Sequence, residues 1–176
     1  ELEALASPVP MSAWPAMQSI ARPKLTELPS DLAIKSPVPS QNDAARDMIA
    51  QVADVLLAAE PLLNELDAKS GDGDTGSTLA TAARALQQNL DQLPLADTPD
   101  LFRALGNELS QTMGGSSGVI LAIYFNAAGD ACNSGASVQE ALSKGLVRVS
   151  EVGGAKVGDR TMIDALSPAL AALNDG

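Results

Sequence analysis

The sequence predicts an all-α fold, an antiparallel bundle or barrel of amphipathic helices. Alanine and leucine dominate the 176 residues, whereas residue types that favour strands are few. From residue 42 onward, apolar residues recur with the 3.6-residue period of a helix. Short segments rich in glycine, serine or proline separate about six such stretches, and short connections favour antiparallel neighbours.

Residues 1–40 are expected to be extended, because seven prolines in this stretch prevent a long helix. We interpret the stretch as an interdomain linker preceded by the last residues of another domain. A disordered leader is the alternative reading of the same composition. Residues 41–176 then form one helical domain.

The first helix should begin at Asn42 or Asp43, either of which can cap it. It should end near Asp67, before a serine and a glycine that favour a turn. The second helix is predicted to run from about Gly76 to Leu90.

The third helix is predicted to open at Thr98 as N-cap, with Pro99 at the first helical position. Proline suits that position because the N–H that it lacks would have no partner there. This helix should end at residues 114–115, and the fourth should run from about residue 116 to residue 133.

The fifth helix opens with Ser137 and Glu140, whose spacing is that of a capping box, and should continue to about Glu151. The sixth helix is expected over residues 161–173. Pro168 lies inside it and should bend it.

The charge balance excludes some classes of partner. The formal net charge is −11, with 11 basic and 22 acidic residues. A protein needs clustered basic side chains to bind either nucleic acid or an anionic membrane surface. We therefore expect neither nucleic acid nor a membrane as a partner. An anionic ligand would need a metal ion or helix N-termini to hold it.

The chain has few features of an exported or membrane protein. Its single cysteine, Cys132, excludes an internal disulfide and fits a reducing compartment. Residues 1–17 carry acids and prolines rather than the basic start and apolar run of a signal peptide. The best apolar stretch, residues 119–128, is too short to cross a bilayer. We therefore expect a cytoplasmic protein without a membrane span.

Three aspartates, Asp67, Asp72 and Asp74, fall in one glycine-broken run. Carboxylates crowded in this way repel one another, and a divalent cation would turn that repulsion into coordination. The chain contains no histidine, so the ligands must be oxygens, which favours Mg²⁺ or Ca²⁺. An EF-hand is excluded because Thr78 or Ala83 stands where its last ligand, a glutamate, is required. A solvated acidic turn remains the alternative.

Two further loops could contact an anion. Residues 112–118 are small and polar, so backbone N–H groups at a helix start could meet a phosphate, but a turn with a serine cap explains them as well. In residues 153–164, Asp159 is a candidate helix cap, and Arg160 could pair with a phosphate or a carboxylate. A capped helix start with a surface Asp–Arg pair is the alternative there.

Taken in this order, the three motifs resemble the nucleotide-binding L domain of dihydroxyacetone kinases over about residues 43–176. The resemblance implies a closed barrel of eight amphipathic helices with the nucleotide at one end. It implies that Asp67, Asp72 and Asp74 ligate two Mg²⁺ ions that bridge the phosphates of ATP. The nucleotide-binding residues that it implies are Thr75, Gly76, Ser77, Thr78, Gly115, Ser116, Ser117, Gly153 and Met162.

The chain departs from this family in two ways. Many members have histidine where Thr75 stands, so a ring contact is lost or replaced. The sequence also yields about six helices rather than eight, and an expected arginine and Asp-Pro-Gly segment have no counterpart before Gly176. We expect a truncated barrel whose apolar faces are exposed.

The function that the resemblance implies is transfer of the γ-phosphoryl group of ATP to dihydroxyacetone. The proline-rich leader resembles the linker of the single-chain, ATP-dependent form, in which a K domain precedes the L domain and holds the substrate covalently on a histidine. Because this chain has no histidine, it should be the ATP- and Mg²⁺-binding half of such an enzyme, and we assign no catalytic residue in it. A homodimer of the full-length enzyme is expected.

Three other functions stay open at this point. Related bacterial L subunits keep a bound ADP that a phosphotransferase protein rephosphorylates, although separate L subunits lack such a leader. A non-catalytic Ca²⁺-binding helical module would also use the aspartates. An interaction domain with a merely solvated acidic turn would bind no metal.

Overall fold

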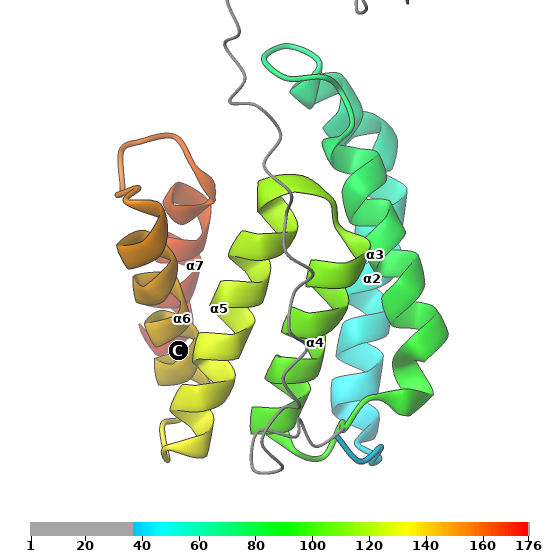
Figure 1. The fold of residues 1–176 in the computed structure, drawn as a ribbon, viewed down its shortest axis with the longest axis vertical. Coiled ribbons are helices and arrows are strands. Elements are labelled where there is room, and N and C mark those ends of the chain that lie inside the picture. Colours follow the sequence, from blue (N-terminus) through cyan, green and yellow to red (C-terminus); the bar gives the residue numbers. More distant parts are fainter. Residues whose placement is uncertain (1–36, 176) are drawn as a thin grey trace, which may run out of the picture. The chain divides into compact units, whose positions relative to one another are not determined.

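The computed structural model describes residues 37–175, and the regular elements in that range are α-helices and one short 3₁₀ helix (Figure 1). The predicted linker over residues 1–40 lies mostly outside the described residues. The elements are α2 (Asp43–Asp67), α3 (Thr75–Asn89), η2 (Leu90–Gln92), α4 (Thr98–Thr112), α5 (Gly115–Asn133), α6 (Val138–Gly153) and α7 (Met162–Asp175). The prediction of about six helices is therefore confirmed within this range.

Two of the predicted helix caps are present. The side chain of Asn42 accepts a hydrogen bond from the backbone N–H of Ala45 at 3.1 Å, and α2 ends at Asp67 as expected. At the start of α6, the N–H of Glu140 donates to Ser137 Oγ at 3.2 Å, and the N–H of Ser137 donates to the Glu140 carboxylate at 2.9 Å. These reciprocal bonds form the predicted capping box.

Two other caps were predicted at the wrong residue. The N-cap of α4 is Asp97 and not Thr98, because the Asp97 carboxylate accepts the N–H of Asp100 at 2.9 Å. Asp159 does not cap α7. Its carboxylate accepts the N–H of Lys156 at 2.8 Å within the preceding loop. Thr161 caps α7 instead, because its Oγ1 accepts the N–H of Ile163 at 3.2 Å, while the Asp164 carboxylate accepts the N–H of Thr161 at 2.8 Å.

The remaining helix ends differ from the predictions by a few residues. α3 begins at Thr75 and gives way to η2 at Leu90, and α6 continues to Gly153, two residues beyond the predicted end. Gly154, with φ of +73°, then turns the chain away from α6, which glycine does without a Cβ penalty. α7 runs from Met162 to Asp175 and contains Pro168, and the bend expected there stays a prediction.

Each helix packs against the next along the chain, from the pair α2 and α3 through to α6 and α7. Successive helices alternate in direction, so the connections after α2, α4 and α6 meet at the same end of the bundle (Figure 1). The three motifs of the sequence lie in these three connections. The up-and-down topology therefore gathers segments that are about 40 residues apart along the chain.

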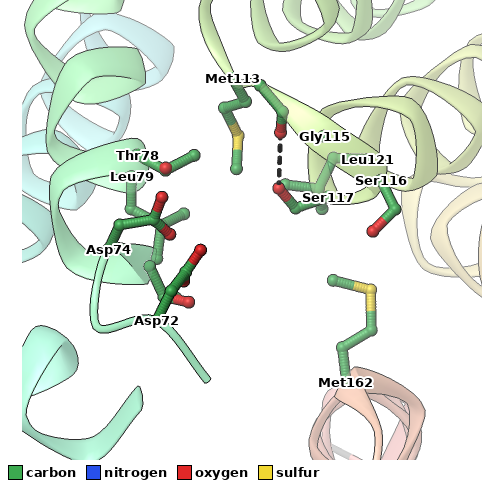
Figure 2. A pocket seen from close by; sticks show the side chains of 12 residues that line it. Asp72, Asp74, Thr78, Leu79, Met113, Gly115, Ser116, Ser117, Leu121 and Met162 are labelled. Carbon is green, nitrogen blue, oxygen red and sulfur yellow. Dashed lines mark hydrogen bonds between the residues drawn. The ribbon is translucent and has the colours of Figure 1, made fainter. Parts of the chain in front are cut away.

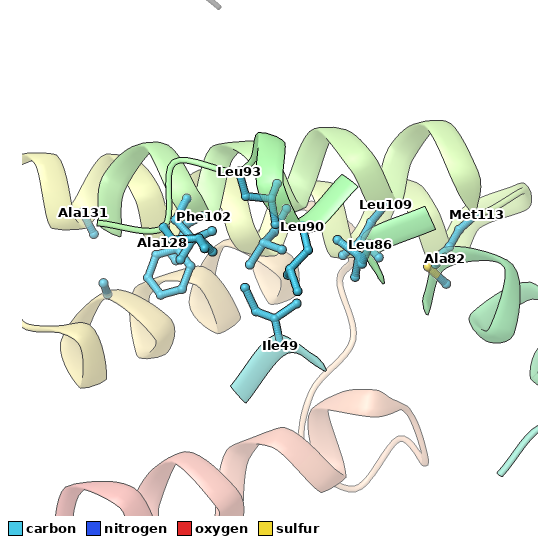
Figure 3. Close-up of a cluster of buried hydrophobic side chains, with 14 residues drawn as sticks. Ile49, Ala82, Leu86, Leu90, Leu93, Phe102, Leu109, Met113, Ala128 and Ala131 are labelled. Atoms are coloured by element: carbon cyan, nitrogen blue, oxygen red, sulfur yellow. The ribbon is translucent and has the colours of Figure 1, made fainter. Parts of the chain in front are cut away.

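The main core lies between α2, α3, α4 and α5, with a contribution from α6 (Figure 3). Its buried side chains are mostly leucine and alanine, and the others are Ile49, Met113 and Phe102. A smaller cluster of Tyr124, Leu146, Val149 and Ile163 joins α5, α6 and α7. Burial of these apolar groups is the main driving force for the bundle.

The segment before α2 is tied to the connection between η2 and α4. The N–H of Ser40 donates to Leu93 O, and the N–H of Leu95 donates to Ser40 O, each at 3.3 Å. Leu95 and Pro94 are the largest side chains that are fully buried among the described residues. This contact lies at the end of the bundle opposite to the three motif-bearing connections (Figure 1).

One face of α2 carries exposed apolar side chains. Met48, Val52, Val55, Leu62 and Leu66 are each at least half exposed and recur at helical spacing. The expectation of exposed apolar faces is met at this helix, whereas the two further helices expected to cover them stay a prediction. None of the helices in residues 37–175 combines the length and apolar character needed to cross a bilayer.

Candidate metal centre and adjoining pocket

A pocket of about 520 Å³ lies where the three motif-bearing connections meet (Figure 2). The first residues of α3, α5 and α7 line it, so three helix N-termini adjoin one cavity. Its lining includes Asp72, Asp74, Thr75, Thr78, Leu79, Met113, Gly114, Gly115, Ser116, Ser117, Leu121 and Met162. No lysine or arginine is among these residues, so a bound anion would depend on a metal ion and on backbone N–H groups.

The three aspartates of the first motif converge, and two of them, Asp72 and Asp74, line this pocket. Asp67, Asp72 and Asp74 each offer a carboxylate oxygen, and these oxygens all lie within 4.8 Å of one another. Hard divalent cations such as Mg²⁺ and Ca²⁺ prefer oxygen ligands of this kind. The donor set therefore fits a magnesium or calcium ion, in agreement with the absence of histidine from the chain.

Asp67 also folds the loop that carries the other two carboxylates. Its Oδ2 accepts hydrogen bonds from the N–H groups of Gly73 at 2.9 Å, Asp74 at 3.0 Å and Thr75 at 3.3 Å. Desolvation raises the pKa of Asp67, but the hydrogen bonds from Thr75, Asp74 and Gly73 together outweigh it, so the pKa lies below its usual value. The carboxylate is thus held in its charged form, and Oδ1 takes no part in these three bonds.

Asp74 is shifted in the opposite direction. The negative charge of Asp72 raises the pKa of Asp74, and desolvation and the charge of Asp67 add to the effect. Asp74 occupies the N-cap position of α3, yet its side chain makes no capping hydrogen bond. Its carboxylate lines the pocket instead (Figure 2). A divalent cation would relieve the repulsion among these groups.

Two glycines allow the loop and α3 to lie against α2. Gly73 has φ of +81°, a conformation that a side chain would strain. Gly76 is buried, and a Cβ added to it would lie 2.2 Å from Glu60 O. The glycines of the motif are therefore required by backbone conformation and by a close approach of helices.

The second motif forms the opposite wall of the pocket. α5 begins at Gly115, with φ of +69°, directly after the N-cap residue Gly114. Ser116 is exposed, while the Ser117 hydroxyl donates to Gly114 O at 3.2 Å (Figure 2). The first backbone N–H groups of a helix have no partners within it, so this turn can donate hydrogen bonds to an anion.

The third motif contributes Met162, whose side chain points into the pocket from the start of α7 (Figure 2). Asp164 holds the preceding loop, because its carboxylate accepts the N–H of Gly158 at 2.6 Å as well as that of Thr161. These bonds lower the pKa of Asp164. Arg160 in this loop has a φ of +61°, and no other non-glycine residue among those described has a positive φ.

The sequence-predicted nucleotide residues fall into three groups. Thr75, Thr78, Gly115, Ser116, Ser117 and Met162 line the pocket together with Asp72 and Asp74. Gly76 and Ser77 face α2, where Ser77 is bonded to Asn64. Gly153 borders an adjoining apolar cleft of about 280 Å³ between α5 and α6, which Ser116 also lines.

Sequence reasoning missed Asn64 and the apolar cleft. Asn64 contacts Ser77, 13 residues further along the chain, and no local spacing rule connects the two. The cleft is formed by side chains such as Ile120, Val149 and Val152, which read as ordinary helix-face residues in the sequence.

An all-α bundle with an acidic, loop-built pocket at one end defines the class of this domain, and comparisons with known proteins identify its family. The DAK2 domain family matches residues 69–176. The chain therefore belongs to the DAK2 domain family. The antiparallel helical fold predicted from the sequence is confirmed.

Individual relatives support the same family. The dihydroxyacetone kinase of Citrobacter freundii is 50% identical over 137 residues, covering 77% of this chain and 25% of that protein. The human triokinase/FMN cyclase is 37% identical over 123 residues, covering 68% of this chain and 21% of that protein. A crystal structure of the C. freundii dihydroxyacetone kinase in complex with AMP-PNP and Mg²⁺ has a TM-score of 0.79 at 44% identity, covering 98% of this chain and 32% of that chain.

This chain thus spans about a quarter of the length of the curated C. freundii relative. Both relatives carry the names of kinases, and they contain further sequence that this chain does not match.

Proposed function

We propose that this chain binds ATP together with Mg²⁺ in the pocket at the N-termini of α3, α5 and α7. The observation that carries the proposal is the convergence of Asp67, Asp72 and Asp74, with oxygens within 4.8 Å of one another, beside a pocket that the glycine–serine turn lines. The similarity to a kinase crystallised with AMP-PNP and Mg²⁺ supports the same ligands.

In this proposal, the carboxylates of the three aspartates bind two Mg²⁺ ions. Their donor set fits, because it consists of oxygens alone and crowds negative charge that only a cation relieves. When bound, the metal would neutralise phosphate oxygens and so lower the cost of charge that develops during phosphoryl transfer.

The residues of the chain itself bind and orient the nucleotide. The N–H groups around Gly115, Ser116 and Ser117 donate hydrogen bonds to phosphate oxygens at the start of α5. Thr75 and Thr78 border the phosphates from α3, and Met162 covers the site from α7. The cleft beside Gly153 is apolar and adjoins Ser116, which suits the base of the nucleotide.

The acceptor must come from outside this chain. Without histidine, the chain has no residue that could hold dihydroxyacetone in the covalent manner of the family. We propose that a K domain presents the substrate and that this domain supplies the γ-phosphoryl group. A homodimer of the full-length enzyme stays a prediction.

Isothermal titration calorimetry of the chain with ATP tests the nucleotide site. Binding should require Mg²⁺ and should vanish in the Asp72→Ala variant, because the remaining carboxylates cannot complete the metal site. Asp91→Ala is the matched control, since Asp91 is an exposed aspartate in η2 outside the pocket. Equal affinity in wild type and Asp72→Ala would reject the site.

A coupled kinase assay with dihydroxyacetone tests the division of labour. The chain alone should give no turnover, and addition of a K domain from a family member should restore it. Turnover by the chain alone would reject the proposal that the acceptor is held elsewhere.

A further inference from the structure

Asn64 and Ser77 form a two-point contact between α2 and α3 next to the acidic loop. The side-chain Oδ1 of Asn64 accepts the backbone N–H of Ser77 at 3.0 Å, and its Nδ2 donates to Ser77 Oγ at 3.0 Å. Both residues are partly buried, so this contact is protected from water on one side. Asn64 lies one helical turn before Asp67 on α2.

The bond to the Ser77 N–H replaces an ordinary helix cap. Ser77 is the third residue of α3, and its N–H is a group that the N-cap side chain normally accepts. The N-cap residue here is Asp74, a good capping residue, yet it makes no such bond. The N–H of Thr75, the first helical residue, is accepted by Asp67. Two side chains of α2 thus cap α3 in place of its own aspartate.

The geometry around Gly76 holds this arrangement in place. A Cβ on Gly76 would lie 2.6 Å from Asn64 Oδ1 and 2.2 Å from Glu60 O. The two helices therefore approach closely at this point, and the Asn64 side chain lies directly against the start of α3.

We propose that Asn64 is a positioning residue that caps α3 so that the Asp74 carboxylate remains available to bind a cation. The inference rests on the proposed function, because it concerns the same metal site. Without Asn64, the Ser77 N–H would lack a partner, and the Asp74 side chain would turn back to accept it. Ser77 then serves as the partner of Asn64 rather than as a side-chain ligand of the nucleotide.

The test uses calorimetry to measure Mg²⁺ binding at a fixed concentration of AMP-PNP. It is carried out on the wild type and on three variants of the chain. Asn64→Ala should weaken the apparent Mg²⁺ affinity by about tenfold or more, as loss of groups that orient metal ligands does. Asn64→Asp should bind Mg²⁺ about as well as the wild type, because its carboxylate still accepts the Ser77 N–H and the serine hydroxyl can donate to it.

Gln87→Ala is the matched control. It removes the bond from Gln87 Nε2 to Asp54 Oδ1, 2.7 Å long, which joins the same two helices away from the pocket. This variant should lower the melting temperature slightly and leave the Mg²⁺ dependence unchanged. A weakening in Gln87→Ala equal to that in Asn64→Ala would overturn the inference, because the effect would then be one of helix packing.

The other outcomes are equally distinct. Wild-type affinity in Asn64→Ala, or a loss in Asn64→Asp as large as in Asn64→Ala, would overturn the role of Asn64 and leave the proposed nucleotide site intact. If Asn64→Ala does not fold, a loss of Mg²⁺ affinity in Asn64→Asp would still overturn the role of Asn64. Absence of Mg²⁺-dependent binding in the wild type itself would reject the proposed function, and the inference with it.

Discussion

The carbonyl oxygen of Glu60 on α2 faces Gly76 on α3 so closely that a Cβ on Gly76 would lie 2.2 Å from it. This approach brings the start of α3 against the end of α2, and the acidic loop is the connection between them. The metal centre therefore depends on helix packing as well as on its ligands.

Gly76→Ala should destabilise the chain by roughly 1–3 kcal/mol, because the added methyl group must push α3 away from α2. Gly153→Ala is the control, since a Cβ there meets nothing within 4 Å. Urea unfolding monitored by circular dichroism measures the free energy of unfolding of both variants. Equal stability in Gly76→Ala and the wild type would show that the two helices do not pack as described.

Asp67 and Asp72 should differ in their effect on the loop. Asp67→Ala removes the acceptor of three backbone N–H groups, so amide hydrogen exchange at Gly73, Asp74 and Thr75 should become faster even without metal. Asp72→Ala should leave these rates unchanged, although both variants lose Mg²⁺ binding. Unchanged exchange in Asp67→Ala would contradict the role of its carboxylate in folding the loop.

Asp74→Asn should raise the melting temperature of the metal-free chain, because it removes a carboxylate whose pKa the charge of Asp72 raises. The same variant should lose the increase in melting temperature that Mg²⁺ gives the wild type. Thermal melts with EDTA and with excess Mg²⁺ measure both effects. A metal-free variant less stable than the wild type would mean that Asp74 stabilises the fold rather than serving the site.

Asp164 should contribute to the loss of stability of the chain as the pH falls. Its folded-state pKa is lowered by hydrogen bonds from Gly158 and Thr161. A lowered folded-state pKa means that the stabilisation is present above the unfolded-state pKa of about 3.9 and is lost as the pH falls through the folded-state value. Urea unfolding between about pH 6 and about pH 2 should therefore show a smaller loss of stability with acid for Asp164→Asn than for the wild type. Parallel curves for the two proteins would contradict this assignment.

The helices could be predicted from the sequence because their signals are local. The apolar period and the capping box at Ser137 and Glu140 lie within a few residues of each other, and the structure has both. The prediction of Thr98 as the cap of α4 was wrong, because Asp97, an equally good capping residue, stands directly before it. Pro61 also lies inside α2, where sequence rules alone would favour a break.

The candidate site was predicted in part for the same reason. The aspartates stand close together in the sequence, so their convergence follows from one glycine-containing turn. The capping of α3 by Asn64 and the cleft beside Gly153 depend on which helices pack together. Such contacts are set by the tertiary fold, and single-sequence patterns contain no direct signal for them.

A crystal structure of this chain grown with AMP-PNP and Mg²⁺ tests the central claim most directly. We predict metal density bound by the carboxylates of Asp67, Asp72 and Asp74, with the phosphates against the turn at Gly115 and Ser116. Nucleotide bound elsewhere, or phosphates in the pocket without a metal on these aspartates, would contradict the proposed function.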